Sequence, residues 1–147
     1  DLKISNIRFD KKHRAICLLD LDTMGHLSLD LELGDAARSW CNRSGEDQSA
    51  GGFDLDIFRA AFVAYLKVNP LPPEEREALV GGIERICLEL AARFAADALW
   101  ESYFGWDSTT FSTRGEHNLI RAQGQAALAR SVRSQSAEMR KVLALKV

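Results

Sequence analysis

From Asp54 onward, apolar residues recur every three or four positions along the chain. This spacing places them on one face of an α-helix, whereas a half-buried strand would show strict alternation. Three such stripes follow one another, over residues 55–66, over residues 83–99, and from about residue 117 towards residue 145. Each stripe is long enough to pack against the others, so the second half of the chain is predicted to be a helical body.

Prolines and glycines divide this helical half. Pro70 and Pro72 follow the first stripe and are expected to end its helix, because proline lacks the backbone N–H that a helix interior needs. Pro73 is followed by two glutamates, which is typical of the first turn of a new helix. Gly81 and Gly82 are expected to interrupt that second helix.

The first half of the chain has a different pattern. Residues 7–10 and 14–20 are short β-favouring runs separated by a charged turn, which predicts a β-hairpin. Further along, the pattern predicts an irregular, partly apolar loop over residues 24–34, a short helix over residues 36–42 capped by Asp35, and a loop over residues 43–52. The predicted fold class is mainly α with a small β-hairpin.

Bulk properties narrow the possible partners and the compartment. The 147 residues suit one domain, and the formal net charge of −2 gives no electrostatic reason to bind nucleic acid or an anionic membrane. No apolar run approaches the roughly 18 residues that a membrane span requires. The three cysteines form neither a C-x-x-C pair nor an even set, and two lie in apolar runs where buried thiols are expected. A cytoplasmic location is therefore expected.

The segment "DLKISN" at residues 1–6 and the end of the second predicted strand carry candidate catalytic groups. Phosphoryl transfer from ATP needs a carboxylate near the attacking hydroxyl and oxygen ligands for Mg²⁺. Asp1 and Asn6 are five residues apart, and the hairpin is expected to return Asp20 beside Asn6. Each residue alone carries little information, because an Asp at a strand end is more often a turn cap. Their combination favours a kinase-like site.

These segments resemble those of the aminoglycoside phosphotransferase family. "DLKISN" is similar to its H-x-D-x-x-x-x-N catalytic loop, "CLLDLDT" to its metal-binding strand end, and "GDAAR" to the segment that follows. "LELAARFAADALWESYF" and "HNLIRAQGQAALARSV" resemble the C-terminal helices of the branch that contains the N-acetylhexosamine 1-kinases. The resemblance implies that residues 1–147 are the C-terminal lobe of a protein-kinase-like fold, and that the N-terminal ATP-binding lobe is absent from the chain.

The same resemblance implies roles for individual residues. Asp1 is expected to be the catalytic base, and Lys3 to reach the transferred phosphate. Asn6 and Asp20 are expected to hold Mg²⁺. The residues implied in acceptor binding are Asp22, Thr23, Arg93 and Tyr103.

The expected parent activity is transfer of the γ-phosphoryl group of ATP to a hydroxyl of a small molecule, with a sugar as the first choice of acceptor. Alternative acceptors are an aminoglycoside, choline or a homoserine-like compound, and a different class of function is a non-catalytic, degenerate kinase lobe. The expected requirements are Mg²⁺ and ATP, without nucleic acid or membrane. The chain alone is expected to be inactive and to self-associate through an apolar face, while its oligomeric state is left open.

Overall fold

The structure is a computed structural model that describes residues 2–22 and 24–144. In chain order these residues form a 3₁₀ turn η1 (Ile4–Asn6), strands β1 (Ile7–Phe9) and β2 (Ala15–Leu18), and helices α1 (Leu29–Trp40), α2 (Leu55–Val68), α3 (Pro73–Trp100) and α4 (Arg114–Ala144). The prediction of a mainly helical chain with one small hairpin is confirmed.

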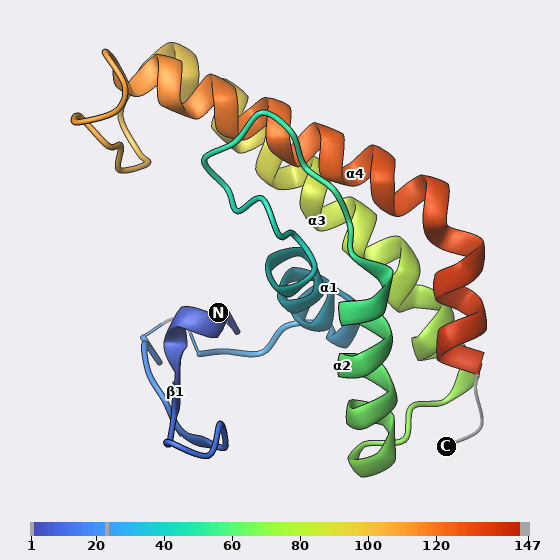
Figure 1. Ribbon diagram of the computed structural model, residues 1–147. Coiled ribbons are helices and arrows are strands. Elements are labelled where there is room, and N and C mark those ends of the chain that lie inside the picture. The colour runs from blue at the N-terminus through green and yellow to red at the C-terminus, as the bar shows by residue number, and fades with distance from the viewer. Residues whose placement is uncertain (1, 23, 145–147) are drawn as a thin grey trace.

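Helices α3 and α4 are the two longest elements and lie antiparallel, side by side (Figure 1). Helix α1 packs on α3, and α2 packs on α4. The predicted helix starts at Pro73 and after Asp54 are both confirmed. Pro73 is the first residue of α3, and the Asp54 side chain caps α2 by accepting hydrogen bonds from the backbone N–H groups of Asp56 and Ile57.

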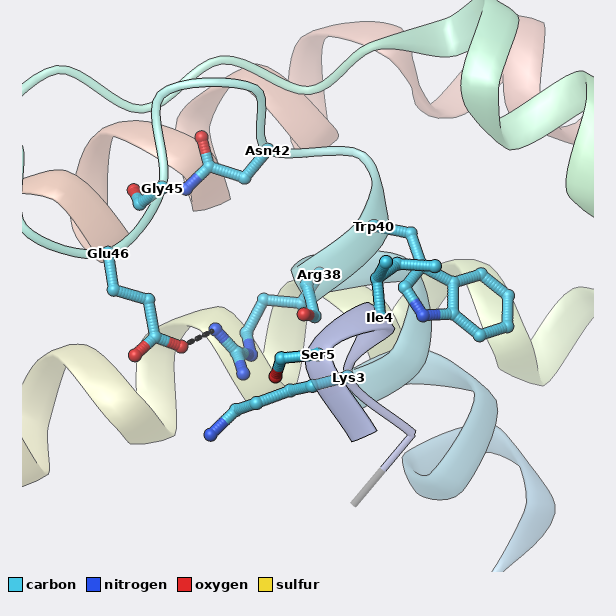
Figure 2. A pocket seen from close by; sticks show the side chains of 9 residues that line it. Lys3, Ile4, Ser5, Arg38, Trp40, Asn42, Gly45 and Glu46 are labelled. Atoms are coloured by element: carbon cyan, nitrogen blue, oxygen red, sulfur yellow. Dashed lines mark hydrogen bonds and ion pairs between the residues drawn. The ribbon is translucent and has the colours of Figure 1, made fainter. Parts of the chain in front are cut away.

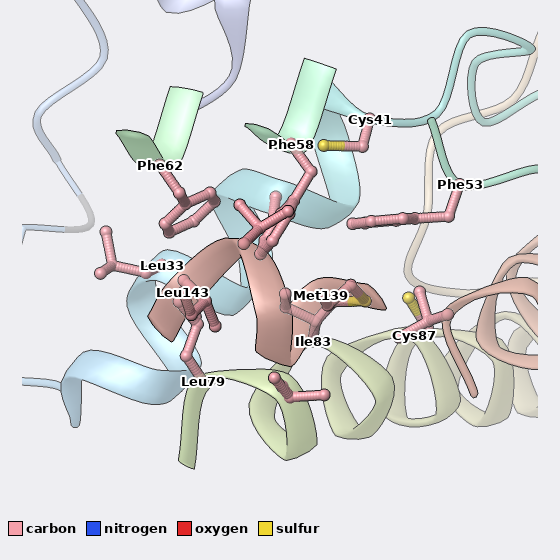
Figure 3. Packing of buried hydrophobic residues seen from close by; sticks show 14 of the residues in the cluster. Leu33, Cys41, Phe53, Phe58, Phe62, Leu79, Ile83, Cys87, Met139 and Leu143 are labelled. Atoms are coloured by element: carbon pink, nitrogen blue, oxygen red, sulfur yellow. The ribbon is translucent and has the colours of Figure 1, made fainter. Parts of the chain in front are cut away.

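The core lies where α1, α2, α3 and α4 meet, and the apolar stripes supply its side chains. Phe58 and Phe62 of α2 face Leu79 and Ile83 of α3 together with Met139 of α4 (Figure 3). Two of the three cysteines, Cys41 and Cys87, are also buried there, and burial raises the pKa of both thiols to about 12. Cys17 is exposed on β2, although it lies in an apolar run of the sequence.

The predicted interruption at Gly81 and Gly82 is wrong, because α3 runs without a break from Pro73 to Trp100. A side chain at Gly82 would overlap the backbone carbonyl oxygen of Asp30, and one at Gly34 would crowd the backbone of Gly82. The two glycines therefore let α1 and α3 cross with their backbones in close contact. The glycine at position 82 serves helix packing rather than helix termination.

The start of α1 also differs from the prediction. The helix begins at Leu29 instead of residue 36, so residues 29–34 of the expected loop are helical. Asp35 consequently lies inside the helix and does not cap it. Burial of Leu33, Ala36 and Ala37 against the core stabilises the first turns, and this tertiary contact outweighs the irregular local pattern.

The hairpin pairs Ile7 with Leu18 and Arg8 with Cys17, as antiparallel neighbours. The Asp10 side chain closes its turn by accepting hydrogen bonds from the backbone N–H groups of Lys12 and Arg14. The hairpin lies to one side of the helical body, near α1 (Figure 1), and β2 is exposed along its whole length. Within the described ranges, no helix combines the length and apolarity needed to cross a lipid bilayer.

Candidate functional site

Asn6 and Asp20 are neighbours at the open end of the hairpin. The backbone N–H of Leu19 donates a 2.7 Å hydrogen bond to the backbone oxygen of Asn6, and Asp20 is the next residue. Asp20 has a φ angle of 59°, in the left-handed region that Asp tolerates better than most residues. The hairpin therefore returns the chain as expected, with Asn6 half-buried and Asp20 exposed.

A hydrogen bond from Trp40 ties the segment that carries Lys3 and Asn6 to the helical body. The indole Nε1–H of Trp40, at the end of α1, donates a 2.6 Å hydrogen bond to the backbone oxygen of Leu2. A contact between residues 38 positions apart holds the segment over α1 although η1 has no buried residue of its own. Asp1 and Thr23, which the resemblance assigned to the site, lie outside the described residues.

A cavity of about 680 Å³ brings the Lys3 segment together with the far end of α3. Lys3 lines one part of it, and Arg93 and Tyr103 line another. Its walls come from α1, from the turns of α3 around Leu90 and from the chain after Trp100. Its volume is in the range of small-molecule sites. Three of the predicted site residues, far apart in sequence, thus face the same cavity.

Arg93 and Tyr103 contact each other at the mouth of this cavity. The guanidinium of Arg93 lies 3.4 Å from the Tyr103 hydroxyl, and its carbon is 5.5 Å and 5.4 Å from the ring centres of Tyr103 and Phe104. Arg93 is also 4.0 Å from Glu89, one turn earlier on α3. Both predicted residues are exposed, so the polar edge of the pair can be reached by a ligand.

Asp97 holds the backbone of Tyr103 in place, and the sequence motifs did not identify Asp97 as a site residue. Its buried carboxylate accepts hydrogen bonds from the backbone N–H groups of Ser102, Tyr103 and Phe104, at 2.9, 2.8 and 2.8 Å, and from Nδ2 of Asn118 at 2.9 Å. Burial opposes ionisation, but the backbone donors outweigh it and lower the pKa of the carboxyl below its usual value. The sequence signal that could have indicated Asp97 is a carboxylate inside the apolar stripe of α3.

Arg38 lines both this cavity and a smaller one of about 300 Å³. It is buried and pairs with Asp35 at 2.8 Å and with Glu46 at 2.7 Å. Burial opposes the charge of Arg38, yet the two carboxylates raise the pKa of its guanidinium above the usual value. Figure 2 shows Arg38 reaching from α1 towards Glu46, with the Lys3 side chain extended beside it. Asp35 therefore pairs with Arg38 inside α1 and does not cap the helix, in contrast to the prediction.

The loop that carries Glu46 is fixed to α4 by charged and aromatic contacts. Asp47 accepts hydrogen bonds from Nε2 of His117 at 2.8 Å and from Nε of Arg121 at 2.6 Å. Because the backbone N–H of Asp107 donates to Nδ1 of His117, the other ring nitrogen must carry the proton given to Asp47. Partial burial opposes ionisation of Asp47, but Arg121 and His117 lower the pKa of its carboxyl.

A second cavity, of about 380 Å³, contains Asp20. Leu2, Met24 and Leu27 line it together with Glu32 of α1, and Glu32 also lines the larger cavity. Asp22 is exposed and is not among the side chains that line either of these cavities. The structure therefore groups Asp20 with the hairpin side of the site and leaves Asp22 outside it.

The oxygen atoms of Asn6 and Asp20 are ligands that suit Mg²⁺ chemically. Within residues 2–22 and 24–144, no group of three or more His, Cys, Asp or Glu side chains is close enough to hold a metal ion. A magnesium ion at this position would take one carboxylate and one amide from the described protein, and its other ligands from phosphate and water. Mg²⁺ often binds in this way, because it loses its water ligands reluctantly.

Comparison with known proteins adds no family assignment. No protein-family model matches the chain, and no curated protein is similar enough to be counted as a relative.

Proposed function

We propose that this chain is the C-terminal lobe of a small-molecule kinase, which transfers the γ-phosphoryl group of ATP to a hydroxyl of a sugar. The observation that carries the proposal is the cavity of about 680 Å³ that is lined by Lys3 and also by Arg93 and Tyr103. A kinase needs its phosphate-contacting groups and its acceptor site within reach of each other. The adjacency of Asn6 and Asp20 at the hairpin end supports the same reading.

In this proposal each group has one task. Asp1 accepts the proton of the attacking hydroxyl, and Lys3 contacts the transferred phosphate. Asn6 and Asp20 hold Mg²⁺, which would neutralise charge on the phosphates of ATP. Arg93 and Tyr103 orient the acceptor through their exposed polar edge. The nucleotide clamp belongs to the N-terminal lobe that the resemblance implies, so the chain alone is expected to be inactive.

The test is ADP release by a protein that joins this chain to such a nucleotide-binding lobe, measured with ATP, Mg²⁺ and a panel of sugars and amino alcohols. We expect turnover with at least one sugar. Asp20→Ala should lower turnover by several powers of ten and alter its dependence on Mg²⁺ concentration, because it removes a charged ligand of the ion.

Asp10→Asn is the matched control, since Asp10 is a carboxylate in the hairpin turn, at the end away from Asn6. It should leave turnover and the Mg²⁺ dependence close to those of the unmodified protein. Near-normal turnover in Asp20→Ala at saturating Mg²⁺ and ATP would contradict the metal assignment. Absence of ADP release with every acceptor, in a folded protein that binds ATP, would instead favour a non-catalytic lobe.

A further inference from the structure

Two side chains, Leu27 and Glu32, line both cavities of the site, and Glu32 is the charged one. It lies near the start of α1, half-buried, between the cavity that contains Asp20 and the larger cavity that contains Lys3 and Arg93. This position alone makes Glu32 a candidate for ligand recognition.

The basic side chains that line the larger cavity are those of Lys3 and of three arginines. The arginines that line this cavity already have carboxylate partners: Arg38 has Asp35 and Glu46, Arg121 has Asp47 at 2.6 Å, and Arg93 has Glu89 at 4.0 Å. Among the described residues, the Glu32 carboxylate has no hydrogen-bond or ion-pair partner. A half-buried carboxylate without a partner is stabilised by any ligand that donates hydrogen bonds to it.

We propose that Glu32 selects the acceptor: it accepts hydrogen bonds from hydroxyl or ammonium groups of a polyhydroxylated compound and disfavours compounds that carry a negative charge. A carboxylate has two oxygens and accepts from neighbouring hydroxyls of one sugar ring. An anionic group in the same place would be repelled and would lose its hydration. This inference rests on the proposed function, which makes the larger cavity the acceptor site, but it concerns binding and does not require phosphoryl transfer.

The neighbouring groups fit an acceptor of this kind. The guanidinium of Arg93 covers one side of the Tyr103 and Phe104 rings, so the cavity presents the polar edge of Arg93 and Tyr103 there. Donors at that edge and an acceptor at Glu32 together match the alternating donors and acceptors of sugar hydroxyls. A purely apolar ligand would leave these polar groups without partners.

Glu32 also has a simpler possible role, which the experiment must separate. A carboxylate in the first turn of a helix stabilises the helix dipole, and both Asp30 and Glu32 occupy the first turn of α1. Asp30 lines neither cavity and lies 3.7 Å from Arg85. Asp30→Asn is therefore a matched control that removes a first-turn charge without changing the cavity.

The experiment titrates residues 1–147 with D-glucose, D-glucosamine and D-glucuronate and follows binding by amide chemical shifts in NMR spectra. These probes share a ring and differ in charge. We expect glucose and glucosamine to bind more tightly than glucuronate. Glu32→Gln should lower the affinity for glucose and for glucosamine about tenfold, and should reduce the difference between these affinities and the affinity for glucuronate. A greater loss for glucosamine than for glucose identifies an ammonium as the group facing Glu32, and the reverse identifies a hydroxyl.

Glu32→Asp keeps the charge and should keep the discrimination against glucuronate, even if the affinity falls, and Asp30→Asn should leave all three affinities unchanged. Absence of binding by both glucose and glucosamine, equal binding of glucuronate, or an unchanged preference in folded Glu32→Gln would each overturn the inference. Because no ATP is present, failure here is distinct from failure of the kinase proposal, which is decided by ADP release.

Discussion

Single residues in this chain are best understood through the hydrogen bonds that surround them. Asp97 illustrates this, because its carboxylate is buried in the apolar stripe of α3 and yet ionised. The three backbone donors that surround it come from residues 102–104, so one side chain holds the segment after α3 and the backbone of Tyr103 in place. Arg38 is a comparable case, since two carboxylates stabilise its charge in a buried position.

We predict that Asp97→Asn lowers the melting temperature by several degrees near neutral pH. The folded-state pKa of this carboxyl lies below its usual value of 3.8, so its ionised form stabilises the fold above about pH 4. That contribution is lost as the pH falls through the lowered pKa. The difference in melting temperature between the two proteins should therefore shrink in acid. Thermal unfolding followed by circular dichroism across a pH series measures it.

Asp56→Asn is the control for this prediction, because Asp56 is an exposed carboxylate at the start of α2. Its substitution should change the melting temperature little at any pH. A melting temperature for Asp97→Asn that equals that of the unmodified chain at neutral pH would show that the buried carboxylate does not hold residues 102–104.

At the scale of secondary-structure elements, close backbone contacts decide where the helices cross. Gly34 and Gly82 allow α1 to approach α3, and Gly124 allows α4 to approach the backbone of Gln48 in the loop before α2. The second contact helps to hold the loop that carries Glu46 and Asp47. The element positions around the cavity therefore depend on residues that have no side chain.

The adjacent glycines of α3 offer a matched pair for testing this. A Cβ at position 82 would overlap the backbone carbonyl of Asp30, so we expect Gly82→Ala to destabilise the fold by about 1–3 kcal/mol. A Cβ at position 81 meets open space, so Gly81→Ala should stabilise the helix by up to about 1 kcal/mol. Urea unfolding of the two variants gives both values.

The decisive result is whether the two substitutions change the free energy of unfolding in opposite directions. If Gly81→Ala and Gly82→Ala changed the free energy of unfolding equally, the crossing of α1 over α3 would not depend on the missing side chain. An equal gain would show that both glycines only weaken α3 through their low helix propensity.

At the scale of the whole molecule, the helical body and the hairpin differ in how much they bury. The body has a continuous core although it also exposes some apolar side chains, such as Leu99 and Trp100. The hairpin and the segment after it have no such core and expose Phe9, Ile16, Leu18, Leu19, Leu21, Met24 and Leu27. An exposed group of this size is typical of a surface that contacts another protein segment. It agrees with the expectation of self-association, which stays a prediction.

We predict that residues 1–147 alone bind Mg·ATP no more tightly than about millimolar. The proposal assigns Asn6 and Asp20 to the metal and the remaining nucleotide contacts to another lobe. Calorimetric titration with Mg·ATP measures the affinity. Micromolar binding with measurable turnover would show that this chain contains the complete nucleotide site.

The sequence by itself determined the helical character of the second half, the helix starts at Leu55 and Pro73, and the hairpin with Asp20 beside Asn6. These features depend on apolar periodicity, capping residues and short-range turns, which act between neighbours along the chain. Only the tertiary structure decided that α3 continues through Gly82 and that α1 begins at Leu29. The tertiary structure also decided that Lys3 and Arg93 line one cavity, and that Glu32 lines two. These depend on contacts between distant segments, where the free energy of burial outweighs local preference.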